Sequence, residues 1–158
     1  MNDFTFYSPT EFVFGRGITD SVGEKLSQKG YKRVLLVYGK GSVVRSGALD
    51  RVKKSLLASH IEFSDLSGVR SNPEVNQVRE GIEIARSFNA DCLLAVGGGS
   101  TIDCAKAISI GVPYEGDVWD FFSGKAVASE CLPVCCVLTF LLLAPRFNSC
   151  VISMMLKI

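Results

Sequence analysis

The chain has 158 residues, of which 47% are hydrophobic and 21% charged, and a net charge of +1, so we expect one domain with a single core. This balance excludes a disordered chain and a basic nucleic-acid binder, and the longest apolar run, 132–144, falls short of the roughly 20 residues of a membrane-spanning helix. Because the N-terminal segment also lacks a secretion signal, we expect a cytoplasmic protein whose six cysteines are reduced.

The predicted elements alternate between strands and helices. The segment FTFYSPTEFVFG is expected to form a short N-terminal β-ribbon, and 18–28 a helix. Continuous apolar runs predict buried strands at 34–38, 92–96 and 134–138, and amphipathic stretches predict helices at 48–58, 75–88 and 101–110. The sequence therefore predicts an α/β fold, with a Rossmann-like parallel sheet flanked by helices.

The predicted strand at 34–38 leads into a turn made of Gly39, Lys40, Gly41 and Ser42. No Asp or Glu stands there to pair with ribose hydroxyls, and Lys40 and Ser42, with Arg45 nearby, could bind a 2′-phosphate by charge and hydroxyl donation. This turn favours NADP over NAD as the cofactor. The alternative is a solvated basic turn.

The predicted strand at 92–96 leads into a helix through Gly97, Gly98, Gly99 and Ser100. Glycines let backbone N–H groups approach an anion, and a helix N-terminus adds unpaired donors and a favourable dipole. The alternative is a tight turn before an ordinary capped helix. Three consecutive glycines favour a pyrophosphate site, although the segment is not a GxGxxG motif.

The remaining polar residues give weaker signals. Asn72 could bond a ribose hydroxyl or an adenine edge, or only shape the turn before Pro73. His60, the only histidine, is expected on the surface at a helix end, and the cysteines, which lack CxxC spacing, are expected to be buried thiols. The acidic and aromatic stretch 117–122 could be a substrate-facing lid or an interface, but core and surface packing is favoured.

Five segments together resemble the N-terminal half of iron-containing alcohol dehydrogenases, in particular their NADPH-dependent butanol dehydrogenase branch: FVFGRG, VLLVYGKGSV, SNPEVNQVREGIEIAR, AVGGGSTIDCAKAI and VWDFFSGK. The resemblance runs from about residue 10 to residue 139. It implies a dehydroquinate synthase-like N-terminal domain whose 39–42 turn is of the NADP type and whose residues 97–100 bind the pyrophosphate. It also implies that Asp103 lies toward the nicotinamide and that Thr139 begins another cofactor-contacting loop.

The reaction implied by the resemblance moves hydride between NADP(H) and an alcohol or aldehyde, with iron or zinc as a Lewis acid. The family's metal ligands, one Asp and three His, lie in a C-terminal helical domain beyond residue 158. We therefore expect a truncated NAD(P)-binding domain (1–158) that has no catalytic residue, binds no metal and is inactive alone.

Two alternatives remain open. One is a nucleotide-binding remnant without turnover that self-associates as a homo-oligomer, and the other is a glycerol dehydrogenase-like or dehydroquinate synthase-like enzyme. After Thr139 the chain departs from the family's LPATGSEMN, so residues 140–158 are expected to reflect small frameshifts unless the sequence there is genuine.

Overall fold

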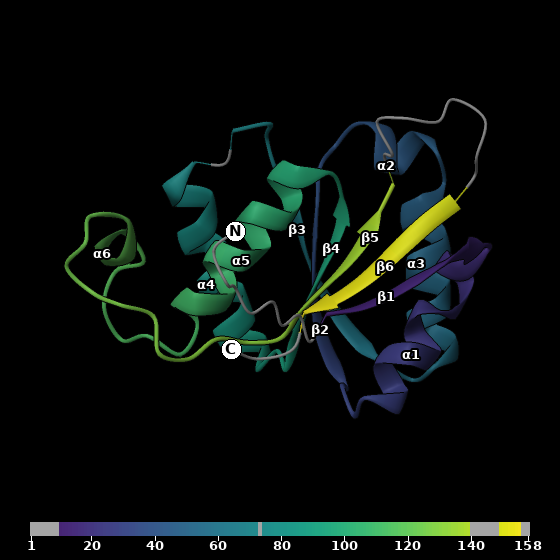
Figure 1. The fold of residues 1–158 in the computed structure, drawn as a ribbon, viewed down its shortest axis with the longest axis horizontal. Coiled ribbons are helices and arrows are strands. Elements are labelled where there is room, and N and C mark those ends of the chain that lie inside the picture. The colour runs from purple at the N-terminus through teal and green to yellow at the C-terminus, as the bar shows by residue number, and fades with distance from the viewer. Residues whose placement is uncertain (1–9, 73, 140–148, 156–158) are drawn as a thin grey trace, which may run out of the picture.

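The computed structural model describes residues 10–72, 74–139 and 149–155, which form one six-stranded sheet with helices on both faces (Figure 1). The strands are β1 (Glu11–Arg16), β2 (Arg33–Tyr38), β3 (Glu62–Ser67), β4 (Cys92–Gly97), β5 (Val134–Leu138) and β6 (Ser149–Met155). The helices are η1 (Ile18–Ser21), α1 (Val22–Gln28), α2 (Ser42–Arg45), α3 (Ala48–Ala58), α4 (Val75–Phe88), α5 (Gly99–Gly111) and α6 (Trp119–Phe122).

The strand order is β1-β6-β5-β4-β2-β3. Neighbouring strands from β3 through β2 and β4 to β5 are parallel, whereas β6 is antiparallel to both β5 and β1. The predicted Rossmann-like parallel sheet is thus confirmed, and it is extended by an antiparallel edge. The predicted N-terminal ribbon is represented by β1, which pairs with β6, while residues 1–9 lie outside the described residues.

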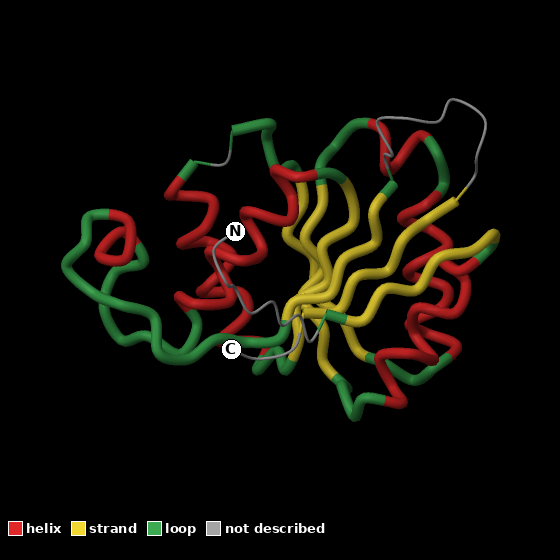
Figure 2. The backbone as a smooth tube through the Cα atoms, in the orientation of Figure 1, coloured by secondary structure: helices red, strands yellow, loops and turns green. Residues whose placement is uncertain are grey.

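Helices lie on both sides of the sheet (Figure 2), and the core consists of two layers of side chains, one on each face. Along β2, Val34 and Leu36 belong to a cluster with residues of α1 and α3, whereas Leu35 and Val37 belong to a cluster with residues of α4 and α5. Successive side chains of a strand point to opposite faces, so an unbroken apolar run supplies both layers.

Most predicted elements are confirmed to within a residue or two at each end. The helices at 48–58 and 75–88 have the predicted bounds, α5 begins two residues before the predicted 101–110, and the first part of 18–28 is a 3-10 turn. The sequence did not predict β3, in which only Leu66 is fully buried because β3 is an edge strand. None of the helices within the described ranges is long and apolar enough to cross a membrane.

Candidate functional site

The two glycine turns lie side by side at the carboxyl edge of the sheet. Tyr38 at the end of β2 is paired with Val96 in β4, so the turns that follow these two strands are neighbours. The chain runs from β2 outward to β3 and then back across β2 to β4, so the strand order reverses between β2 and β4. In open α/β sheets, ligands bind in the crevice at such a switch point.

The glycines of the 97–99 turn have different physical roles. Gly97 has φ +153°, and a Cβ there would lie 2.8 Å from the Thr101 Oγ1, so the fold itself requires glycine. A Cβ on Gly98 or Gly99 would meet no atom within 4 Å. Nothing inside the described chain needs these two glycines, and together they leave open space in front of a helix, which fits a ligand that approaches the backbone closely.

The N-terminus of α5 faces this open space. Gly98 is the N-cap residue, and its carbonyl accepts the amides of Thr101 and Ile102 at 3.1 and 3.2 Å. The amides of Gly99 and Ser100 belong to the first turn and have no acceptor within the helix. These two donors, with the positive end of the helix dipole, form a site suited to an anion such as a diphosphate.

Two further loops reach the same edge. The Ser100 hydroxyl donates to the carbonyl of Ser71 at 2.6 Å, which joins α5 to the loop that contains the exposed Asn72. The amide of Thr139 donates to the carbonyl of Gly97 at 3.2 Å, so the end of β5 lies beside the turn. The structure therefore brings all the predicted loops together. The Ser100 hydroxyl donates to the Ser71 carbonyl, and no side chain caps α5.

The 39–42 turn carries two cations. Lys40 is exposed, and the Arg45 Nη2 lies 3.9 Å from the position that a Cβ on Gly41 would take. Ser42 begins α2. Neither cation forms an ion pair with a carboxylate of residues 10–72 or 74–139, so both charges are available to an anionic ligand.

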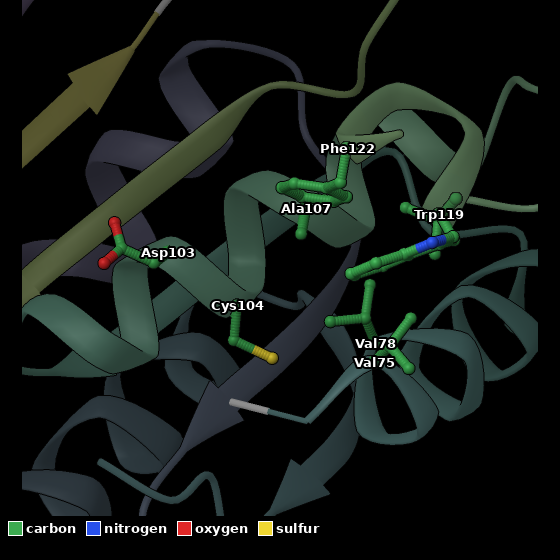
Figure 3. Close-up of a pocket in the computed structure, with 8 residues that line it drawn as sticks. Val75, Val78, Asp103, Cys104, Ala107, Trp119 and Phe122 are labelled. Carbon is green, nitrogen blue, oxygen red and sulfur yellow. The ribbon is translucent and has the colours of Figure 1, made fainter. Parts of the chain in front are cut away.

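A pocket of about 310 Å³ lies between α4, α5 and the α6 segment (Figure 3). Its lining residues are largely apolar: Val75, Val78, Asp103, Cys104, Ala107, Val118, Trp119 and Phe122. Burial raises the pKa of the Cys104 thiol to about 11, so this thiol is neutral and unreactive near pH 7. Asp103 is exposed at one end of the pocket, near the glycine turn.

The 117–122 stretch closes the other end of this pocket. Val118 is buried, whereas Trp119 and Phe122 are 53% and 60% exposed. Asp117 accepts hydrogen bonds from the Arg79 Nε and Nη2 at 2.8 and 3.1 Å, and this guanidinium lowers the pKa of the Asp117 carboxyl. Sequence reasoning identified the stretch but missed the pocket, because its walls come from three separate segments.

The described residues do not fit a metal site. They contain no group of three or more His, Cys, Asp or Glu side chains that could bind an ion. His60 is exposed after α3, at the amino edge of the sheet and thus opposite the glycine turns.

Cys92 and Cys135 are buried with their sulfurs 3.7 Å apart, and the hydrogen bond to Cys135 together with burial raises the pKa of Cys92. Among the described free cysteines, Cys92, Cys104, Cys135 and Cys136 are buried as predicted, whereas Cys131 is half-buried.

Comparison with known proteins gives a consistent result. The profile of the family described as "Iron-containing alcohol dehydrogenase" matches residues 9–141. The probable NADH-dependent butanol dehydrogenase 2 of Bacillus subtilis is 45% identical over 148 residues, which are 94% of this chain and 38% of that protein. The NADPH-dependent aldehyde reductase of Escherichia coli is 33% identical over 143 residues, covering 88% of this chain and 36% of that protein.

The solved structures agree. The NADH-dependent butanol dehydrogenase A of Thermotoga maritima superposes with a TM-score of 0.86 at 43% identity, over 89% of this chain and 35% of that one. The chain therefore spans little more than a third of the length of the relatives it matches. On the matched profile, the fold and the glycine turn at its switch point, this chain belongs to the iron-containing alcohol dehydrogenase family.

Proposed function

We propose that the chain is the nucleotide-binding domain of an oxidoreductase that transfers hydride between NADP(H) and an alcohol or aldehyde. One observation carries this proposal: two glycine turns lie side by side at the switch point of a parallel sheet, one of them in front of the N-terminus of a 13-residue helix. A dinucleotide supplies the diphosphate that such a helix end binds.

Each loop has a place in this proposal. The amides of Gly99 and Ser100 bind the diphosphate, and the open positions at Gly98 and Gly99 admit it. Asn72 and Thr139, whose loops lie at the same edge, contact the nucleoside parts. Asp103, one turn further along α5, lies toward the nicotinamide and at the rim of the apolar pocket.

The cofactor preference rests on the 39–42 turn. Lys40 and Arg45 are cations without a carboxylate partner in the described part of the chain, and no acidic residue follows β2 to bind ribose hydroxyls. This charge favours a 2′-phosphate and hence NADP(H). The names of the relatives differ on this point, since the Bacillus and Thermotoga proteins are named NADH-dependent and the Escherichia protein NADPH-dependent. Parallel titrations with NADPH and NADH measure the preference directly.

The proposed substrates are short alcohols and aldehydes, the classes in the names of the relatives. Hydride transfer in this family also uses a metal, and the described residues of this chain offer no ligand set for one. We therefore propose no step on a metal bound by this chain, and we propose that the chain alone binds the dinucleotide without turnover.

A calorimetric titration with NADPH, followed by an assay of butyraldehyde reduction with added ferrous ion or zinc, tests both parts. Binding without turnover is the expected result. Turnover by the 158-residue chain would contradict the proposed inactivity, and no affinity for either NADPH or NADH would contradict the dinucleotide site itself.

We also propose that the protein is cytoplasmic and that it self-associates through β1. Free buried thiols such as Cys92 and Cys135 suit a reducing compartment. The edge strand β1 exposes two large apolar side chains, Phe12 and Phe14, at 67% and 66%, and an exposed apolar edge strand is a surface suited to pairing with a second copy.

A further inference from the structure

Gly68, the first residue after β3, contacts the side chain of Lys40. A Cβ on Gly68 would lie 2.7 Å from the Lys40 Cε and 3.5 Å from both Cδ and Cγ. The methylene chain of Lys40 therefore runs across the α-carbon of Gly68. Any larger residue at position 68 would push this chain away.

The backbone around this contact keeps the two loops together. The amide of Val69 donates to the carbonyl of Tyr38 at 3.1 Å, and a Cβ on Gly39 would lie 3.3 Å from the Val69 carbonyl oxygen. The loop after β3 thus lies against the turn after β2. Gly68 has φ +83°, a conformation that glycine adopts without strain.

This packing affects how the Lys40 ammonium reaches a ligand. A lysine side chain has many rotamers, and ordering them on binding reduces affinity. A stem that already packs along a backbone groove has fewer rotamers to lose, while its charged end remains in water. The contact with Gly68 thus holds the stem beside the 39–42 turn, where the ribose of the proposed dinucleotide lies.

We propose that Gly68 is a positioning residue for cofactor choice, because its bare α-carbon orders the Lys40 side chain for the 2′-phosphate of NADP(H). This inference rests on the proposed dinucleotide site and adds a residue from a different loop. Gly68 does not touch the cofactor; it acts through Lys40.

The test compares the ratio of NADPH affinity to NADH affinity in the 158-residue chain and its variants. Gly68→Ala is expected to lower this ratio about fivefold to tenfold, the size of one charge-assisted contact made less well. Gly30→Ala is the matched control, because Gly30 has φ +86° and a Cβ there would meet no atom within 4 Å. It introduces the same backbone strain away from Lys40 and should leave the ratio unchanged.

A second pair of variants separates positioning from general damage. In a Lys40→Met background the ammonium is absent, so adding Gly68→Ala should not change the ratio further. A ratio that stays unchanged in Gly68→Ala, or that falls equally in the Lys40→Met background, overturns the inference while dinucleotide binding stands. If the wild-type chain binds neither nucleotide, the proposed function fails and the inference fails with it.

A measurement on the wild-type chain does not depend on how the variants fold. A nuclear Overhauser effect between the Lys40 Hε and Gly68 Hα protons, retained when NADPH is added, is expected. Its absence in the bound state would show that the stem leaves Gly68 on binding, and this too overturns the proposal.

Discussion

The hydroxyl of Ser100 donates a 2.6 Å hydrogen bond to the carbonyl of Ser71, and this bond joins the first turn of α5 to the loop after β3. The two residues are 29 positions apart in the sequence, so their contact depends on the tertiary fold. It also keeps Asn72, the next residue, at the edge where the nucleotide is proposed to bind.

Removing this hydroxyl should weaken nucleotide binding more than it weakens the fold. In Ser100→Ala the 71–72 loop loses its attachment, and we expect NADPH affinity to fall about fivefold, equivalent to one hydrogen bond of about 1 kcal/mol. Calorimetry measures the change. Ser87→Ala is the control, since the Ser87 hydroxyl also donates to a backbone carbonyl, that of Ile84 at 3.1 Å, but within α4 and away from the glycine turns. Equal effects in the two variants would contradict a specific role for Ser100.

Alanine substitutions at two glycines of the same turn should have opposite effects, one on nucleotide binding and the other on stability. Gly98→Ala puts a methyl group in open space at ordinary backbone angles, so the free energy of unfolding should change by less than about 1 kcal/mol while NADPH binding is lost. Gly97→Ala forces a methyl group against the Thr101 Oγ1 at positive φ and should lower the melting temperature. Thermal unfolding and titration of both variants check this contrast. Full NADPH binding by Gly98→Ala would argue against close approach of a ligand there.

The contact between α4 and α5 should be sensitive to a single added methyl group. A Cβ on Gly111 would lie 2.3 Å from the Ile82 Cδ1, so Gly111→Ala is expected to reduce the free energy of unfolding by about 1–3 kcal/mol. Ile82→Val removes the Cδ1 methyl and should restore part of this loss in the double variant. Urea denaturation of the two single variants and the double variant measures the coupling, and simple additivity would show that the methyl groups do not meet.

The Arg79–Asp117 pair should make the 117–122 stretch sensitive to acid. The guanidinium and the amide of Trp119 both donate to the Asp117 carboxylate and hold its pKa below the ordinary value of 3.8. Because the folded-state pKa is depressed, the pair stabilises the fold above the unfolded-state pKa, and this contribution is lost as the pH falls through the lower, folded-state value.

Emission from Trp119, the only tryptophan, reports on this change. The emission should shift as the pH falls below about 4, since the carboxylate begins to protonate there. In Arg79→Gln the shift should begin at a higher pH, because the guanidinium no longer stabilises the carboxylate. A transition at the same pH in both proteins would show that Asp117 is not its source.

Short stretches of sequence by themselves determined the buried strands, the bounds of two helices and the positions of the two glycine turns. The runs at 34–38, 92–96 and 134–138 are apolar at every position or nearly so, and each forms a strand covered on both faces. The periodicity of α3 and α4 predicted their bounds, and Gly39, Gly41 and the three glycines at 97–99 marked the two turns. These signals are local, because strand burial, helix periodicity and turn formation each depend on the types of a few neighbouring residues.

Only the tertiary structure decided how these pieces combine. The pairing of Tyr38 with Val96 makes the two turns neighbours, the contact of Lys40 with Gly68 joins the loops after β2 and β3, and the pocket needs walls from α4, α5 and α6. The sequence also did not predict β3. This edge strand has one fully buried residue and lacks the apolar run of its neighbours. The physical reason is that strand pairing and side-chain contacts between distant segments depend on the free energy of the whole core, which no local window of sequence contains.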